Sequence, residues 1–498
     1  MNLQDFLEHH HLVRNPFAEE DAQTDAVFKQ YCIDSTFHPA WDKVFGSPLD
    51  PSTSIVFGPK GSGKTAMRLQ LDKHIRNHNR LQSDKRVFVI QYDDFNGSLG
   101  HLQSRMGNWS SHKPEKILQQ VAIQDHMDAI LVQGVTTLVD QVLQTSNSSL
   151  TPDIQVRQDA IDNLDKNQRH DLLLLATVYD QSTLGNTSIR WEQLCHRLRI
   201  SKWRASLDWL LAWVGSVVVG LACVILYFRE QLSLKTAVGA FIVLSLLLSG
   251  RYLWRMLRCY YRSQQLWHHC RVRRQSIAEQ ARLLLKQPWS FWASNAMPMD
   301  RVSASRYELL EKFQHILRTL GFSGIFVLVD RIDKPQLVNG QPERMRLLLW
   351  PLLDNKLLKH PGVGFKLLLP QELQTFVERE NREFHERARL DKQNVIASFD
   401  WTGEALFDLV AARMQACAQP GQHPQPQELF DPSIDTGRLI AAMRELRTPR
   451  NLFRFLYRLV SEHCKKYTAS EPQYRIAVAT FESVLALCQE EYRRQGNP

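Results

Sequence analysis

Short apolar runs alternate with amphipathic stretches along most of this chain. Four runs have the length of a buried strand: Ser54 to Phe57, Arg86 to Phe95, Gly324 to Val329 and Val363 to Pro370. Elsewhere, above all over 114–180 and in the last part of the chain, apolar residues recur at three- and four-residue steps, which predicts helices. Strands that alternate with helices predict an α/β fold, with a parallel sheet that helices cover on both faces.

Two longer apolar segments lie between the second and the third of these strands. Trp209 to Phe228 carries no charge and is about 30 Å long as a helix, which matches the hydrocarbon core of a bilayer. Thr236 to Gly250 is also uncharged, and it extends to Trp254 if the basic residues at its ends direct their charges to the membrane surface. The pattern predicts a hairpin of two transmembrane helices, at about 209–228 and 236–254. The alternative is a buried helical hairpin of a soluble protein.

Charges are distributed unevenly around this hairpin. Both outer flanks are basic, with Arg197, Arg199, Lys202 and Arg204 before the hairpin and Arg251, Arg255, Arg258 and Arg262 after it. The connecting loop has only Arg229 and Lys235, offset by Glu230. Because basic flanks stay on the cytoplasmic side, we expect both flanks and both termini to be cytoplasmic, at the inner or plasma membrane of the cell. Basic flanks also favour anionic lipid as a partner.

Composition adds a preference for anionic partners. The chain has 498 residues and a formal net charge of +9 at pH 7, with 44% hydrophobic and 23% charged residues. This charge suits nucleic acid, acidic lipid or nucleotide phosphates without choosing among them, and it also suits a mildly basic enzyme. The eight cysteines include no CxxC pair, so neither a disulfide framework nor a zinc site is expected.

The first apolar run leads directly into a glycine-rich loop. Its residues are Gly58, Pro59, Lys60, Gly61, Ser62, Gly63, Lys64 and Thr65, which fit the pattern GxxxxGK[ST] at every required position. The glycines let backbone N–H groups wrap phosphates, and the N-terminus of a following helix attracts anions. We expect Lys64 to reach the β- and γ-phosphates and the Thr65 hydroxyl to bind Mg²⁺. ATP is the favoured nucleotide because no NKxD-type guanine motif is present.

The third apolar run ends in a carboxylate. Asp330 follows it directly and is the predicted second ligand of Mg²⁺, often through water. Hydrolysis also needs a base that orients the attacking water. Asp333 is the first candidate, and Asp93 or Asp94, at the end of the second run, is the alternative. Arg331 stands where many enzymes of this class have a second acid, so binding without turnover stays an alternative.

Arginines late in the chain are candidates for sensing the γ-phosphate. Arg450 follows a proline at a predicted helix start, and Arg447 is its rival. Arg387 and Arg389 could instead be arginine fingers for a neighbouring subunit of a homo-oligomer. The alternative for each arginine is a solvated, charged surface.

The loop, the acidic strand end and the inserted hairpin together resemble the KAP family of P-loop NTPases, part of the larger STAND-like group of ATPase switches. The resemblance rests on Gly58 to Thr65, on Asp330 and Asp333, and on the hairpin at 209–254. It implies transmembrane helices inserted between the Walker A and Walker B motifs. The family pattern has an acid where this chain has Arg331, a departure that concerns hydrolysis more than binding.

The two ends of the chain look like those of ATPases of the origin-recognition and transposition-regulator type. In that type an NPF segment, here Asn15 to Phe17, precedes the loop, and a Pro-Arg helix start, here Pro449 and Arg450, closes a lid. Bacterial members of the KAP group are linked to phage exclusion and other conflict systems. The resemblance therefore implies a role in bacterial defence or signalling.

These observations predict a P-loop NTPase core with an inserted helical region. The predicted segments are a lead-in over 1–50, a core in two parts over 51–113 and 291–400, a helical insertion with the hairpin over 114–290, and a C-terminal helical lid over 401–498. The predicted function is a membrane-anchored switch that binds and hydrolyses ATP and acts on an unknown protein partner. The alternatives are a membrane-tethered ATPase that depends on nucleic acid and a scaffold that binds nucleotide without hydrolysing it.

Overall fold

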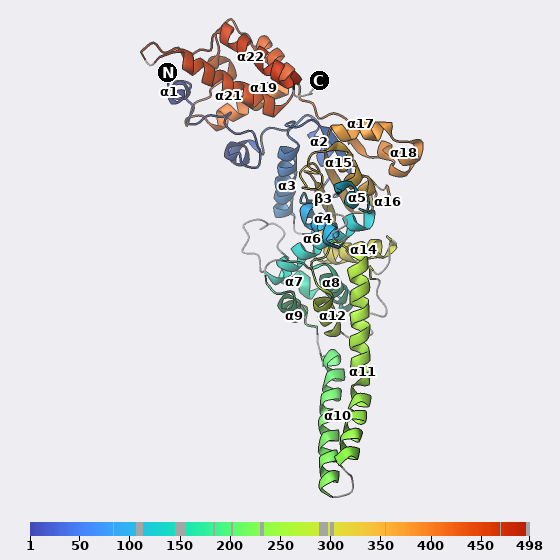
Figure 1. The fold of residues 1–498 in the computed structure, drawn as a ribbon. Helices are drawn as coiled ribbons and strands as arrows, with labels where there is room; N and C mark the ends of the chain where they lie inside the picture. Colours follow the sequence, from blue (N-terminus) through green and yellow to red (C-terminus); the bar gives the residue numbers. More distant parts are fainter. Residues whose placement is uncertain are drawn as a thin grey trace.

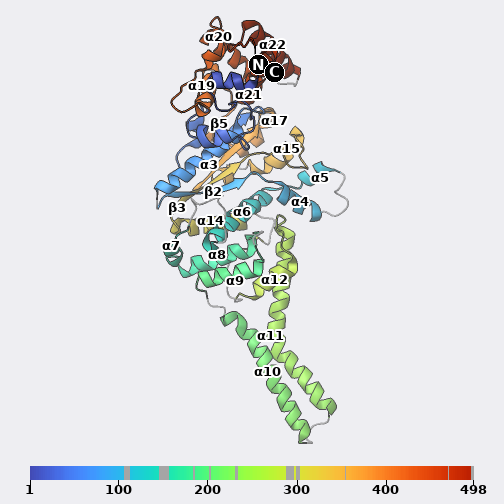
Figure 2. The same cartoon turned by 90° about the vertical axis from the view of Figure 1, so that its left-hand side faces the viewer.

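The computed structural model describes residues 1–498 except 83, 106–112, 145–155, 183–184, 201–202, 230–233, 288–296, 299–302, 354, 469 and 495–498. Lys202, Glu230, the side chain of Arg204 and the predicted boundary at 290 lie outside the described residues. The protein is an α/β fold with four parts along one axis (Figures 1 and 2). These parts are a helical bundle with both chain ends, a sheet between helices, a further layer of helices, and two long helices that project from it.

Five parallel strands form the sheet. They are β1 (Ser54–Gly58), β2 (Arg86–Tyr92), β3 (Phe322–Val329), β4 (Val363–Pro370) and β5 (Asn394–Ile396), in the order β2-β3-β4-β1-β5. The four apolar runs are the first four strands, although the second strand ends at Tyr92 and not at Phe95. Gly58 pairs with Pro370, and Val329 pairs with Leu367. The carboxyl ends of β1, β3 and β4 therefore lie at one edge of the sheet.

Helices cover both faces of this sheet. Those on one face are α2 (Trp41–Phe45) and α3 (Lys64–Leu81), and those on the other are α6 (Ile123–Leu143) and α14 (Ala304–Thr319). Successive side chains of a strand point to opposite faces. Val56 accordingly belongs to the core shared with α3, while Ile55 and Phe57 belong to the core shared with α6 and α14. Burial on both sides explains why these strands are continuous apolar runs.

Further helices complete the layers around the sheet. Beneath α6 and α14 lie α8 (Lys166–Tyr179), α9 (Thr187–Arg197) and α12 (Ile277–Leu285), which share their core (Figure 2). The shorter helices are α4 (Asn96–Arg105), α5 (Pro114–Leu118), α7 (Gln158–Asp162), α15 (Pro342–Leu349), α16 (Asn355–Leu358), α17 (Glu372–Arg379) and α18 (Arg382–Ala388), with 3₁₀ turns at Trp350–Leu352, Leu390–Lys392 and Pro426–Leu429.

Two antiparallel helices project from the layer below the sheet. They are α10 (Trp203–Phe228) and α11 (Leu234–His269), which lie side by side (Figure 1). A Cβ at Gly215 would stand 3.1 Å from Leu248, and one at Gly220 would stand 3.2 Å from Phe241. Glycine at these two positions therefore lets the helices pack closely.

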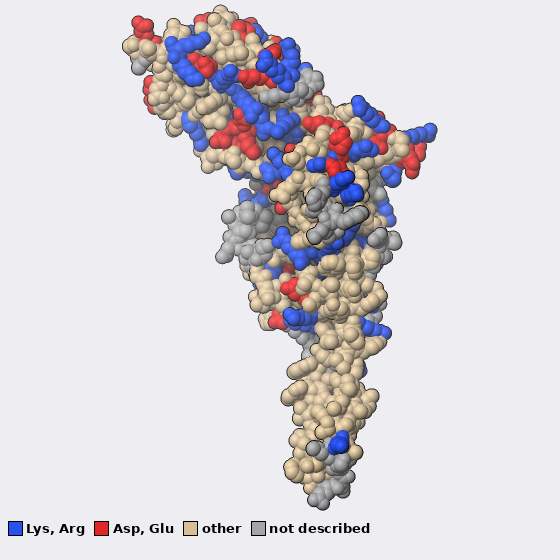
Figure 3. Space-filling view, viewed as in Figure 1, with Lys and Arg blue, Asp and Glu red and all other residues tan. Residues whose placement is uncertain are grey.

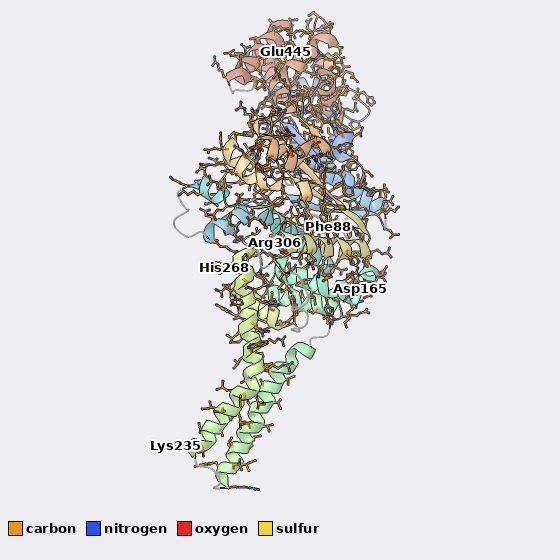
Figure 4. The ribbon with its side chains drawn as sticks, turned by 90° about the vertical axis from the view of Figure 1, so that its right-hand side faces the viewer. Phe88, Asp165, Lys235, His268, Arg306 and Glu445 are labelled. Carbon is orange, nitrogen blue, oxygen red and sulfur yellow. The ribbon has the colours of Figure 1, made fainter. Side chains whose placement is uncertain are left out.

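The outer surface of this pair of helices is apolar. Leu221, Ile225 and Leu247 are exposed, the last with 71% of its surface accessible, and Figure 3 shows few charges there except near the tip, where Figure 4 labels Lys235. Within the described residues, one helix, over Val238–His269, is long and apolar enough to cross a membrane, and the apolar part of α10, Ala212–Phe228, is shorter. The expected second helix at 236–254 thus continues to His269.

The C-terminal helices share one core with the beginning of the chain. The bundle consists of α19 (Gly403–Ala416), α20 (Thr436–Leu446), α21 (Pro449–Lys466) and α22 (Val478–Arg494), together with α1 (Leu3–His9) and the π-helix Phe28–Cys32. Phe6, Leu12 and Phe17 are buried in this core. Much of the predicted lead-in is therefore part of the bundle.

Candidate functional site

The glycine-rich loop connects the end of β1 to the start of α3. Gly61 and Gly63 have φ angles of 89° and 94°, in the left-handed region that glycine adopts without strain. A Cβ at Gly61 would lie 2.7 Å from that of Arg450, and a Cβ at Gly58 would lie 2.7 Å from that of Phe399. Chain segments from elsewhere in the fold therefore approach the loop backbone closely.

Lys64 is the first residue of α3 and folds back over the loop. Its Nζ donates to the main-chain oxygens of Gly58 at 2.6 Å and Pro59 at 2.8 Å. Burial lowers the pKa of Lys64 to about 8, and the negative charge of Asp330 is the largest influence that opposes this shift. The ammonium group is thus held by two neutral acceptors, which an anionic acceptor can replace with stronger hydrogen bonds.

Asp330 stands at the carboxyl end of β3, 265 positions after Thr65 in the sequence. The Thr65 hydroxyl donates to Oδ2 of Asp330 at 3.1 Å. The backbone N–H of Arg331 donates to Oδ1 at 2.8 Å, and Nε of Arg68 lies 3.4 Å from Oδ2. Burial raises the pKa of Asp330, and the Arg68 charge is the largest influence that lowers it. The two residues predicted to bind a metal are therefore hydrogen-bonded neighbours.

The three candidate bases occupy different places. Asp333 lines the same cleft as the loop. Asp93 is ion-paired with Arg68 at 2.9 Å. Asp94 accepts a backbone N–H at the start of α4 and lines a separate cavity of about 580 Å³. Of these acids, Asp333 is the one that faces the cleft.

Arg331, between Asp330 and Asp333, has an unusual backbone conformation. Its φ angle is 62°, in the left-handed region that costs a residue with a side chain about 1–2 kcal/mol. Its side chain also lines the cleft. The sequence showed an arginine in place of an acid at this position, but it could not predict the strained backbone conformation of that arginine.

A cleft of about 200 Å³ lies beside the loop, between the sheet and the C-terminal bundle. The loop and the residues after β3 form one wall. The facing wall comes from both ends of the chain, and its residues include Glu20, Asp25, Phe28, Thr36 and His38 from the N-terminal segment and Leu409, Arg413, Arg450 and Phe453 from the bundle.

Aromatic side chains occupy the part of the cleft next to the loop. The His38 ring stacks on Phe399 with 3.7 Å between centroids, and Nε1 of Trp401 donates to the main-chain oxygen of Ser62 at 2.8 Å. Burial lowers the pKa of His38 to about 4, so its ring is neutral at pH 7. Sequence reasoning missed all three rings because no motif contains them.

The four candidate arginines lie at different distances from the glycine-rich loop. The backbone N–H of Arg450 donates to the main-chain oxygen of Gly61 at 3.4 Å, and its side chain lines the cleft. Arg447 stands at the C-terminal end of α20, and Arg387 lines a separate groove around Trp350. Arg389 is 3.6 Å from Asp391. Arg450 is the one that lies beside the loop.

No protein-family model, no curated protein and no solved structure matches this chain. The geometry of the cleft is therefore what bears on its chemistry.

Proposed function

We propose that this cleft binds ATP with Mg²⁺ and that the protein is a membrane-anchored switch that hydrolyses ATP. The observation that carries the proposal is the 3.1 Å hydrogen bond between Thr65 and Asp330, at the carboxyl ends of two strands of one parallel sheet. Ligands of open α/β sheets bind at this edge. A hydroxyl, a carboxylate and a lysine that meet there match the needs of a nucleotide phosphate and its metal ion.

The loop suits a triphosphate. Gly61 and Gly63 present backbone N–H groups without side chains, and α3 begins at Lys64 with the N–H groups of its first turn directed toward the loop. Two polar atoms there, Oγ of Ser62 and Nε of Arg450, are buried and have no hydrogen-bond partner among the residues that the structure describes. Buried groups of this kind are costly unless a ligand or water satisfies them. We expect Lys64 to leave its two carbonyl partners and bind the β- and γ-phosphates.

Thr65 and Asp330 would hold Mg²⁺. No cluster of three or more His, Cys, Asp or Glu side chains suited to a metal occurs in the part of the chain that the structure describes. Mg²⁺ needs no such cluster when one carboxylate and the substrate phosphates supply its ligands. When bound, the ion would neutralise charge on the phosphates. The charge of Arg68, whose Nε lies 3.4 Å from Oδ2 of Asp330, opposes the rise in the pKa of this carboxyl group that burial causes.

Asp333 is the residue that we expect to orient the attacking water, because it is the candidate acid that lines the cleft. Arg450 would bind the γ-phosphate and connect its presence to α21. The apolar and aromatic wall around Phe28, Trp401 and Phe453 would hold the nucleotide base.

Binding without turnover is the second candidate function, and it is favoured by Arg331 at the position of the missing acid.

The projecting helices would anchor the protein. Their exposed apolar surface is what a bilayer covers, and α11 continues into the arginine-rich stretch that begins at Arg251. We propose two spans, cytoplasmic flanks that contact anionic lipid, and membership of the KAP type of P-loop NTPases. The place of α10 and α11 in the chain, after the glycine-rich loop and before the strand that ends at Asp330, supports this proposal.

The test is ATP turnover by the full chain in nanodiscs of anionic lipid. We expect turnover in the wild type that Lys64→Ala and Thr65→Ala abolish, and that DNA leaves unchanged. Stimulation by single- or double-stranded DNA would favour a tethered nucleic-acid ATPase. Nucleotide binding that depends on Lys64 but gives no turnover would favour the scaffold. Absence of both binding and turnover would contradict the proposal.

A further inference from the structure

Glu20 faces the glycine-rich loop from the other side of the cleft. It belongs to the segment between Phe17 and Phe28, both of which are buried in the core of the C-terminal bundle. This segment is therefore anchored to the bundle at both of its ends. Glu20 is ion-paired with Arg450 and Arg454, which are one helical turn apart on α21.

The two arginines interact with Glu20 at different distances. Nε of Arg454 donates to Oε2 of Glu20 at 2.7 Å, and this hydrogen bond is the largest influence that raises the pKa of Arg454. Nε of Arg450 is 3.9 Å from the same oxygen and is buried, with no hydrogen-bond partner in the described part of the chain. Arg450 is therefore held by a long ion pair that leaves a donor unsatisfied.

Arg450 also faces a like charge. Its guanidinium group contributes to the lowered pKa of Lys64, although burial is the larger cause. Two cations that converge on one small cleft repel each other unless an anion lies between or beside them. In this structure Glu20 is a carboxylate that lines the cleft, with its Oε2 3.9 Å from Nε of Arg450.

We propose that Glu20 takes the place of the γ-phosphate at Arg450 in the nucleotide-free protein, and that the γ-phosphate of a nucleoside triphosphate displaces it. This inference rests on the proposed function. A phosphate group offers more negative charge and three acceptor oxygens, so it satisfies Arg450 better than a carboxylate at 3.9 Å. A diphosphate lacks the group that reaches Arg450. Glu20 therefore competes with a triphosphate but not with a diphosphate, which lowers the preference of the cleft for the triphosphate and couples γ-phosphate binding to the N-terminal segment.

The experiment measures binding of two nucleotides to the full chain in anionic-lipid nanodiscs. The probes are the β,γ-imido analogue of ATP, which is not hydrolysed, and ADP. We expect Glu20→Gln to tighten binding of the ATP analogue about fivefold and to leave ADP binding within twofold of the wild type. Glu19→Gln is the matched control, because it removes an adjacent carboxylate that contacts Thr24 and does not line the cleft.

Two double variants test the route of the effect. In Glu20→Gln with Arg450→Ala the gain should vanish, so that affinity equals that of Arg450→Ala alone. In Glu20→Gln with Arg454→Ala the gain should remain. Equal tightening for both nucleotides, or the same gain from Glu19→Gln, would show a general charge effect and overturn the inference. Failure of the wild type and every variant to bind either nucleotide would overturn the proposed function itself.

Discussion

Lys366 is a buried lysine in the middle of β4. Its side chain is fully buried, its Nζ donates to the main-chain oxygen of Ser52 at 2.8 Å, and it lies 4.7 Å from the centroid of the Phe326 ring. Burial lowers the pKa of Lys366 to about 7. The folded protein thus resists protonation of this amine, whereas the unfolded chain, with a lysine pKa near 10.4, does not.

This difference predicts a pH-dependent stability. Between about pH 10 and pH 7 the unfolded chain binds a proton that the folded protein does not, so Lys366 lowers the free energy of unfolding as the pH falls, and the loss is complete below pH 7. We expect Lys366→Met, which has a similar volume, to stabilise the protein at pH 7 by on the order of 2 kcal/mol and much less at pH 10. Denaturation of both proteins at the two pH values measures this. If the two proteins differ in free energy of unfolding by the same amount at pH 7 and at pH 10, the lowered pKa of Lys366 is not the cause.

At the same scale, sequence motifs identify only part of the cleft. Lys64, Thr65 and Asp330 were predictable because each stands in a short pattern tied to a strand end. Glu20 and Trp401 were not, since they reach the loop only through packing of the bundle against it. Their position depends on the tertiary structure, and no motif or periodic pattern in the sequence indicates it.

Among the elements, the four long strands were predictable and the ends of helices were not. Burial on both faces makes β1 to β4 continuous apolar runs, whereas β5 has three residues and no such run. α11 was expected to end near 254 because hydropathy falls there. It continues to His269 because Arg255, Cys259 and Leu266 are buried, and Arg255 donates to the main-chain oxygen of Leu285 at the end of α12.

The inner end of α11 is tied to the elements around the sheet by a buried ion pair. Arg306, at the start of α14, donates to both carboxylate oxygens of Asp128 on α6 at 3.3 Å and to the main-chain oxygen of His269 at 3.1 Å. Figure 4 shows Arg306 beside the end of α11, where His268 is labelled. Both charged side chains are fully buried. α14 leads directly into β3, so this contact joins the projecting helix to the strand that ends at Asp330.

Breaking one side of this pair should be costly. We expect Arg306→Met to lower the free energy of unfolding by about 3–5 kcal/mol, because it leaves the Asp128 charge buried without its partner. Arg306→Met combined with Asp128→Leu should recover most of this loss, since neither charge of the pair then remains. Thermal unfolding of the three proteins in one lipid or detergent provides the comparison. If the double variant is as unstable as the single one, the cost comes from lost packing and not from the charge.

At the scale of the whole molecule, the length of α11 determines how deep the protein would sit in a bilayer if the hairpin spans it as proposed. Its 36 residues span about 54 Å, against about 30 Å for a hydrocarbon core. Only the outer part can lie in lipid, and the inner part, which packs on α12, stands clear of it. In the proposed membrane anchoring, this length would hold the sheet and the cleft away from the membrane surface, with α10 and α11 as the connection.

The distribution of charge around the hairpin then predicts its orientation. With basic outer flanks in the cytoplasm, the tip at Arg229 should face the opposite side of the membrane, while Ser433, exposed on the bundle, should face the cytoplasm. In intact cells we expect a membrane-impermeant maleimide to label Arg229→Cys, and to label Ser433→Cys only after the membrane is opened. Background from the native chain should be low, since seven of its eight cysteines are buried, and the wild type measures it. If only Ser433→Cys were labelled in intact cells, the orientation of the hairpin would be the opposite of the one predicted. Labelling of both sites only after opening would mean that the hairpin does not cross the membrane.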